Sequence, residues 1–183
     1  MATPLARPVV RDVIAVLGGL LLLGVVCGVL WWLLVSPAEY TKTRQGGVMD
    51  EAQLARRFSV KAVYVVIALV AGLASGLGLS WWRGRNPLFT SVLLVVGSLV
   101  AAAAMALVGH ALGPGDTGQA LEAARLGARV PETLSVGRDE WTVYLAWPVA
   151  VLAGALVVLL GAPLEDEAST VDAETHASLR RRR

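Results

Sequence analysis

The sequence predicts an all-α polytopic membrane protein, a four-helix transmembrane bundle with two longer extracytoplasmic loops. Hydrophobic residues make up 56% of the 183 residues and charged residues only 16%. Soluble globular proteins have about 45–50% apolar and about 25% charged residues. The charges also fall in discrete blocks between long apolar runs, and tryptophans mark the ends of several runs. Composition, charge pattern and tryptophan placement all favour the membrane class.

Four segments are long enough to cross a bilayer, which needs roughly 20 consecutive apolar residues. They cover about residues 13–35, 62–82, 88–112 and 141–162, and none contains Asp, Glu, Lys or Arg. The first exceeds the 7–15-residue apolar region of a cleaved signal peptide, so we expect it to be a retained anchor. Residues 1–162 therefore form one transmembrane domain.

Tryptophans are predicted to anchor the spans at the membrane interface. The anchors are Trp31 and Trp32 after the first span, Trp81 and Trp82 after the second, and Trp141 before the fourth. Indole rings favour the headgroup region of a bilayer. The same residues therefore set the expected ends of the spans.

The basic residues predict a plasma-membrane protein with both termini in the cytoplasm. Arg83 and Arg85 lie in a very short connection between the second and third spans, and a compact basic turn is hard to translocate. The totals of basic residues on the two sides are equal, so the orientation depends on that turn. Residues 163–183 are acidic and then basic without an apolar period, which predicts a disordered cytoplasmic tail.

The two outer loops carry local structure signals. Gln45-Gly46-Gly47 is a turn signal between Tyr40–Arg44 and Val48-Met49, which favours a small hairpin. Asp50 is a candidate N-cap for a short helix over Glu51–Phe58 that leads into the second span. In the second loop, Gln119–Ala128 has helical spacing, and an extended stretch is expected from Val130.

Two small-residue motifs predict close helix packing. Gly24 and Gly28 form GxxxG in the first span, and Gly72 and Gly76 form it in the second. This spacing lets two helix backbones approach closely. Because the motifs occur in consecutive spans, we expect the first and second spans to pack together.

The sequence offers little chemistry. His110 near the end of the third span has no partner at ligand spacing, and the single cysteine, Cys27, excludes an intramolecular disulfide. The usual nucleophile, P-loop and zinc-protease motifs are absent. With a net charge of +2, the composition does not favour nucleic-acid binding. We expect no catalytic residues, no cofactor and no metal.

The favoured function is a non-enzymatic scaffold or accessory subunit in the lipid bilayer, with a membrane-protein partner or as a homo-oligomer. The alternative is a small transporter or channel that acts as an oligomer. Its polar path would use Thr90, Ser91, Ser98 and His110 of the third span. A membrane enzyme that uses loop acids such as Glu51 or Asp139 is a third, open class.

The order of short motifs resembles a family of actinobacterial four-helix membrane proteins of unknown function. The motifs are Ser36-Pro37 after the first span, Trp81-Trp82-Arg83 and Pro87 around the next connection, and Trp147-Pro148 in the fourth span. The resemblance covers roughly Val13 to Ala162. It implies an uncharacterised protein of the bacterial cell envelope and carries over no catalytic residue.

Overall fold

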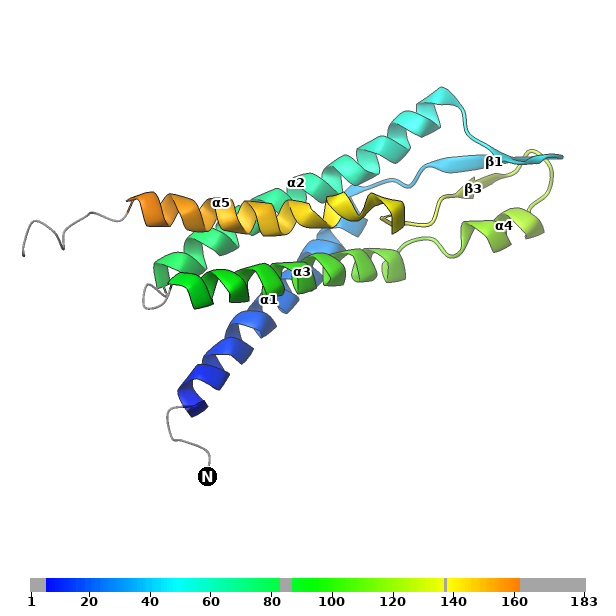
Figure 1. The fold of residues 1–183 in the computed structure, drawn as a ribbon. Helices are drawn as coiled ribbons and strands as arrows, with labels where there is room; N and C mark the ends of the chain where they lie inside the picture. Colours follow the sequence, from blue (N-terminus) through cyan, green and yellow to red (C-terminus); the bar gives the residue numbers. More distant parts are fainter. Residues whose placement is uncertain (1–5, 83–86, 137, 162–183) are drawn as a thin grey trace, which may run out of the picture.

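Four long helical segments form the body of the molecule (Figure 1). The computed structural model describes residues 6–82, 87–136 and 138–161. The helices are α1 (Ala6–Leu34), α2 (Glu51–Trp82), α3 (Pro87–Leu112) and α5 (Ala146–Gly161), the last preceded by a 3-10 helix, η1 (Arg138–Leu145). Four helical segments are long and apolar enough to cross a membrane, as the sequence predicted. The basic turn at residues 83–86 and the tail at 163–183 lie outside the described residues.

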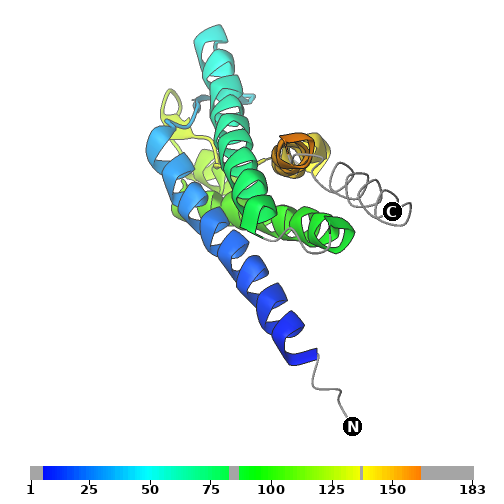
Figure 2. The same ribbon diagram turned by 90° about the vertical axis from the view of Figure 1, so that its left-hand side faces the viewer.

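The helices form two crossed layers rather than a parallel bundle (Figures 1 and 2). Helices α3 and α5 lie side by side, and α1 and α2 run obliquely across them. The extensive contacts are α1 with α3 and α2 with α5, whereas α1 and α2 touch over a short stretch only. The prediction that the first two spans pack together along their motifs is therefore wrong.

The two longer connections fold together at one end of the body. They contribute the strands β1 (Glu39–Thr43), β2 (Gly46–Val48) and β3 (Arg129–Pro131) and the short helix α4 (Thr117–Ala123). The strands form an antiparallel sheet in the order β2-β1-β3, with Thr41 opposite both Val48 and Arg129. We call residues 38–49 and 113–136 the cap. Because of this sheet, the molecule is mostly helical but not all-α.

The local signals of the loops are largely reproduced. The hairpin forms around a turn at residues 44–45, and Gly46 has a φ of 128°, a value that suits glycine. The Asp50 side chain accepts a hydrogen bond from the Gln53 N–H, and the predicted short helix is simply the start of α2. Helix α4 ends at Ala123, five residues earlier than expected.

The fourth span differs from its predicted form. It begins as η1 and becomes α-helical only at Ala146. Pro148 is the third residue of α5, directly after the change from the 3-10 helix η1. Its fixed φ of about −65° is compatible with both helical forms.

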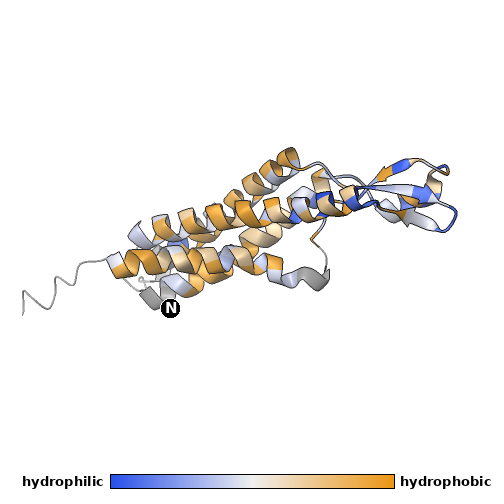
Figure 3. Cartoon of the chain, turned by 90° about the horizontal axis from the view of Figure 1, so that it is seen from above, coloured by the Kyte–Doolittle hydropathy of each residue, from blue (hydrophilic) through white to orange (hydrophobic). Residues whose placement is uncertain are grey.

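The outer surface of the body is apolar, and the polar residues gather in the cap (Figure 3). Large apolar side chains are exposed on each long helix, among them Ile14, Val66, Val92 and Leu160. Soluble proteins rarely expose so much contiguous apolar surface. This distribution is typical of helices that face lipid.

Candidate functional site

The first glycine pair lies where α1 crosses α3. A Cβ atom on Gly24 would collide with the Ala101 carbonyl oxygen. A Cβ on Gly28 would lie 2.8 Å from the Met105 carbonyl oxygen and 2.8 Å from Val108 Cβ. Both glycines thus let α1 rest directly on the backbone of α3, the geometry that small-xxx-small spacing allows.

The second glycine pair lies where α2 crosses α5. A Cβ on Gly72 would lie 2.9 Å from the Trp147 carbonyl oxygen, and one on Gly76 would collide with the Val151 carbonyl oxygen. Gly154 gives α5 a matching small residue, since its Cβ would lie 2.7 Å from the Leu73 carbonyl oxygen. All four predicted packing glycines lie at helix contacts, but each pair faces a helix that the sequence did not indicate.

The predicted tryptophan anchors divide into one buried and four exposed residues. Trp31 is fully buried, and its indole N–H donates a hydrogen bond of 3.0 Å to the Val60 carbonyl oxygen. The expectation that it faces the membrane interface is wrong, because the close approach at Gly109 gives its ring a place inside the body. The exposed residues are Trp32, Trp81, Trp82 and Trp141.

Trp31 belongs to a buried aromatic cluster beneath the cap. Its ring meets Tyr64 edge to face at a centroid distance of 5.2 Å, and Tyr64 meets Tyr144 of η1 at 6.2 Å. The Tyr64 hydroxyl donates to the Ala102 carbonyl oxygen at 2.9 Å. Helices α1, α2 and α3 and η1 therefore meet at one apolar point, where the Trp31 indole and the Tyr64 hydroxyl both donate to backbone.

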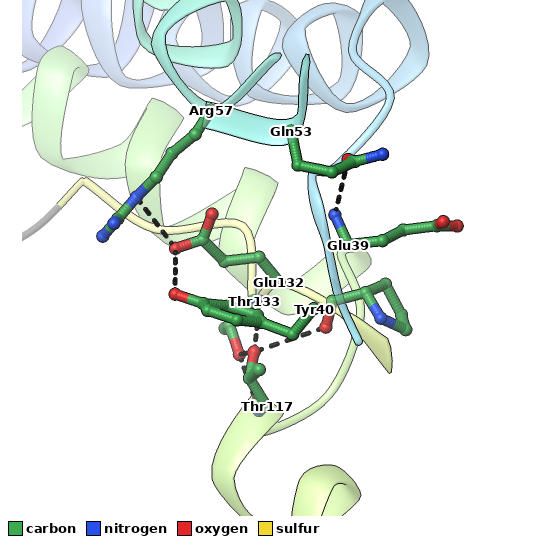
Figure 4. A network of polar contacts seen from close by, with 8 residues as sticks. Glu39, Tyr40, Gln53, Arg57, Thr117, Glu132 and Thr133 are labelled. Atoms are coloured by element: carbon green, nitrogen blue, oxygen red, sulfur yellow. Dashed lines mark hydrogen bonds and ion pairs between the residues drawn. The ribbon is translucent and has the colours of Figure 1, made fainter. Parts of the chain in front are cut away.

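Glu132 is the centre of the polar network in the cap (Figure 4). Its Oε1 lies 3.0 Å from Arg57 Nε on α2 and accepts a hydrogen bond of 3.5 Å from the Tyr40 hydroxyl on β1. Its own N–H donates to the Ala38 carbonyl oxygen at 2.7 Å. One carboxylate thus joins both connections and the start of α2.

The segment around Glu132 is held on both sides. Two reciprocal hydrogen bonds join Thr133 and Thr117. The Thr133 N–H donates to the Thr117 hydroxyl oxygen at 2.6 Å, and the Thr117 N–H donates to the Thr133 hydroxyl oxygen at 3.0 Å. The Leu134 carbonyl oxygen lies 3.2 Å from His110 Nδ1 at the end of α3. Val130, Leu134 and Val136 are buried, and Glu132 has the same alternating register. This alternation is the signal by which the sequence could have singled out Glu132.

The bonds of this network hold both connections and the start of α2 together. Glu132 pairs with an arginine and a tyrosine, and the Gln53 side chain accepts from the Glu39 N–H at 2.9 Å. In the described part of the chain, no group of three or more His, Cys, Asp or Glu side chains could hold a metal ion.

The polar residues proposed for a transport path along α3 do not form a continuous row. Ser98 is buried, and its hydroxyl donates to the Val95 carbonyl oxygen of its own helix at 2.8 Å. His110 is exposed at the cap end, and Thr90 and Ser91 are half-buried at the opposite end. A hydroxyl bonded back to its own helix adds little polarity to a path.

Comparison with known protein families, curated proteins and solved structures finds no match for this chain. The resemblance to actinobacterial four-helix membrane proteins therefore stays a prediction.

Proposed function

We propose that this chain is an integral protein of the bacterial plasma membrane that acts as a non-enzymatic scaffold or accessory subunit of a membrane complex. In this proposal both termini are cytoplasmic and the cap lies on the outer side. The support for insertion is the apolar surface of all four long helices, together with the concentration of charged residues in the cap.

The observation that carries the scaffold role is the internal use of the polar groups of the cap. Glu132, Arg57, Tyr40 and the pair Thr117 and Thr133 bond to one another or to backbone. Groups used in this way fix the shape of the cap over the helices and are not presented to a reactant. A rigid platform of this kind suits a subunit that is recognised by another protein.

The transporter alternative receives less support from α3. The hydroxyl of Ser98, near the middle of α3, donates a hydrogen bond to a carbonyl oxygen of the same helix. His110 contacts the Leu134 carbonyl oxygen of the cap. A transport path usually needs polar groups near the middle of the membrane, often on interrupted helices. Helix α3 is continuous from Pro87 to Leu112.

The test is purification of a tagged copy from its native membrane in mild detergent, followed by mass spectrometry and measurement of mass. We expect a stoichiometric membrane-protein partner. A double variant, Glu132→Ala with Thr133→Val, should lose that partner while remaining in the membrane, and Glu122→Ala on the exposed side of α4 is the matched control. A lone monomer, or a homo-oligomer with flux in proteoliposomes, would overturn the scaffold proposal.

A further inference from the structure

The level at which α2 leaves the hydrocarbon layer follows from contacts at the cap end. The hydrogen bond from Trp31 to the Val60 carbonyl oxygen places the last turn of α1 beside Val60. Trp32, the next residue of α1, is 40% exposed. From Val60 to the exposed Trp81, α2 rises about 32 Å at 1.5 Å per residue, close to the hydrocarbon thickness of about 30 Å. Residues 51–59 of α2 therefore lie at the cap-side edge of that layer and beyond it.

Helix α2 has a buried row and an exposed row on opposite faces. The buried row has a spacing of four residues: Val60, Tyr64, Ala68, Gly72 and Gly76. Val66 and Val70, each two residues before a member of that row, are 58% and 64% exposed. Two residues correspond to about 200° around a helix, so these valines lie on the face opposite the body.

The exposed row continues past Val60 into the first turns of α2. Phe58 and Leu54 continue its spacing, and they are 75% and 53% exposed. Measured along the helix, Phe58 lies about 3 Å and Leu54 about 9 Å beyond Val60. The interfacial layer on each side of a bilayer is about 5–7 Å thick. Phe58 thus falls within the headgroup layer, and Leu54 lies about 2 Å beyond it along the helix axis, a distance that the outward lean of α2 shortens.

The direction of α2 turns this face toward the membrane. Figure 1 shows that the first turns of α2 diverge from α5, so the helix leans away from the body at the cap end. When a helix leans outward, the face opposite the body turns toward the bilayer surface. Arg57 on the other side reaches Glu132 of the cap, and Arg56 beside it is exposed.

We propose that Leu54 and Phe58 seat the first turns of α2 in the phospholipid headgroup layer on the cap side. The occupant of this surface is lipid: the upper acyl chains contact Phe58, and the headgroup phosphates lie beside the basic side chains of the same turns. Aromatic and leucine side chains flanked by Lys or Arg are typical of interfacial helices. The inference rests on the proposed membrane insertion and adds that the cap is held at a fixed height by α2.

The test uses nitroxide labels on single cysteines in vesicles of phosphatidylcholine and phosphatidylglycerol. The native cysteine, Cys27, is buried, and it is first removed by Cys27→Ala so that each variant carries a single cysteine. Labels are placed by Leu54→Cys and Phe58→Cys, with Arg56→Cys as a control at similar height on another face. Val66→Cys reports the span, and Arg44→Cys reports the exposed turn of the hairpin. Collision rates with oxygen, which partitions into lipid, and with a water-soluble nickel chelate are compared.

We expect the oxygen-to-nickel ratio to fall from Val66 to Phe58 to Leu54 as depth decreases, and to be higher at both Phe58 and Leu54 than at Arg56 and Arg44. Water-like ratios at Leu54 and Phe58, with a lipid-like ratio at Val66, would overturn this inference and leave insertion intact. A water-like ratio at Val66 would overturn the proposed membrane function, and this inference with it.

Discussion

In the helical body, neighbouring helices touch through the backbones of small residues, whereas in the cap the segments are joined by side-chain hydrogen bonds and an ion pair. Gly24 and Gly76 each lie against a carbonyl oxygen of the facing helix. In the cap, Glu132 bridges Arg57 and Tyr40, and Thr117 is hydrogen-bonded to Thr133. The two regions therefore fail in different ways: the body when atoms are added, the cap when polar groups are removed.

This difference follows from the surroundings that we propose for each region. In lipid the hydrophobic effect gives helices little reason to associate, so close packing has to supply the attraction. In water an exposed polar pair contributes little, and several bonds in one network are needed to order a loop. Substitutions at matched positions test whether the body depends on close packing and the cap on polar bonds.

The largest effect is expected from Gly76→Leu. The new side chain must displace the Val151 backbone, so α2 and α5 should separate, with a loss of about 3 kcal/mol of stability, the upper end for overpacked sites. Gly78→Leu is the control, because a Cβ at Gly78 meets nothing within 4 Å. Reversible unfolding in mixed micelles measures both. Equal stabilities of the two variants would contradict the crossing of α2 and α5.

A somewhat smaller effect is expected from Gly24→Ala on the other helix pair. The methyl group would meet the Ala101 carbonyl oxygen, and separation of α1 from α3 should cost roughly 2 kcal/mol. Gly19→Ala lies in open space on the same helix and should be neutral or stabilising by up to about 1 kcal/mol. The same unfolding measurement applies, and a loss at Gly19 that matched the loss at Gly24 would argue against the α1–α3 contact.

Trp31→Phe should come next, at about 1.5 kcal/mol, because it removes a buried hydrogen bond to Val60 and part of the ring packed on Gly109. Its neighbour gives the control: Trp32→Phe changes an indole that is 40% exposed and should cost a few tenths of a kcal/mol at most. Thermal unfolding in detergent distinguishes the two. A greater loss of stability for Trp32→Phe than for Trp31→Phe would contradict the buried position of Trp31 and the exposed position of Trp32.

The sequence predicted the apolar parts of the four long helices well, because crossing a bilayer requires uninterrupted apolar runs and the charged residues of this chain lie outside those runs. It also located the packing glycines, yet it paired the wrong helices. A GxxxG motif shows that a backbone approaches closely but does not identify the partner. Small residues such as Ala101 and Gly154 made α3 and α5 equally suitable partners.

Single residues were harder to place than segments. Trp31 and Trp32 are adjacent and chemically identical, yet they lie about 100° apart around α1, so one is buried and the other is not. Glu132 was not singled out from the sequence, because its partners Arg57 and Tyr40 lie in distant parts of the chain. Its register with Val130 and Leu134 was the local signal available.

The smallest effect is expected from Glu132→Gln. The side chains of Glu132 and Arg57 are 20% and 45% exposed, so water and salt already weaken their attraction, and we expect a loss below about 1 kcal/mol. The change should be local: faster hydrogen exchange of β1 and β3, with the exchange of α3 and α5 unaltered. Added salt should speed the exchange of β1 and β3 in the native protein but have little further effect in the variant, because the ion pair is already lost.

Glu122→Gln on the exposed side of α4 is the control and should leave the exchange of β1 and β3 unchanged. If Glu132→Gln instead loosened α2 and α5 together with the cap, the cap and body would form one cooperative unit. The separation into a sterically packed body and a hydrogen-bonded cap would then describe local contacts only, because the Arg57 contact at the start of α2 would transmit the loss to the helices.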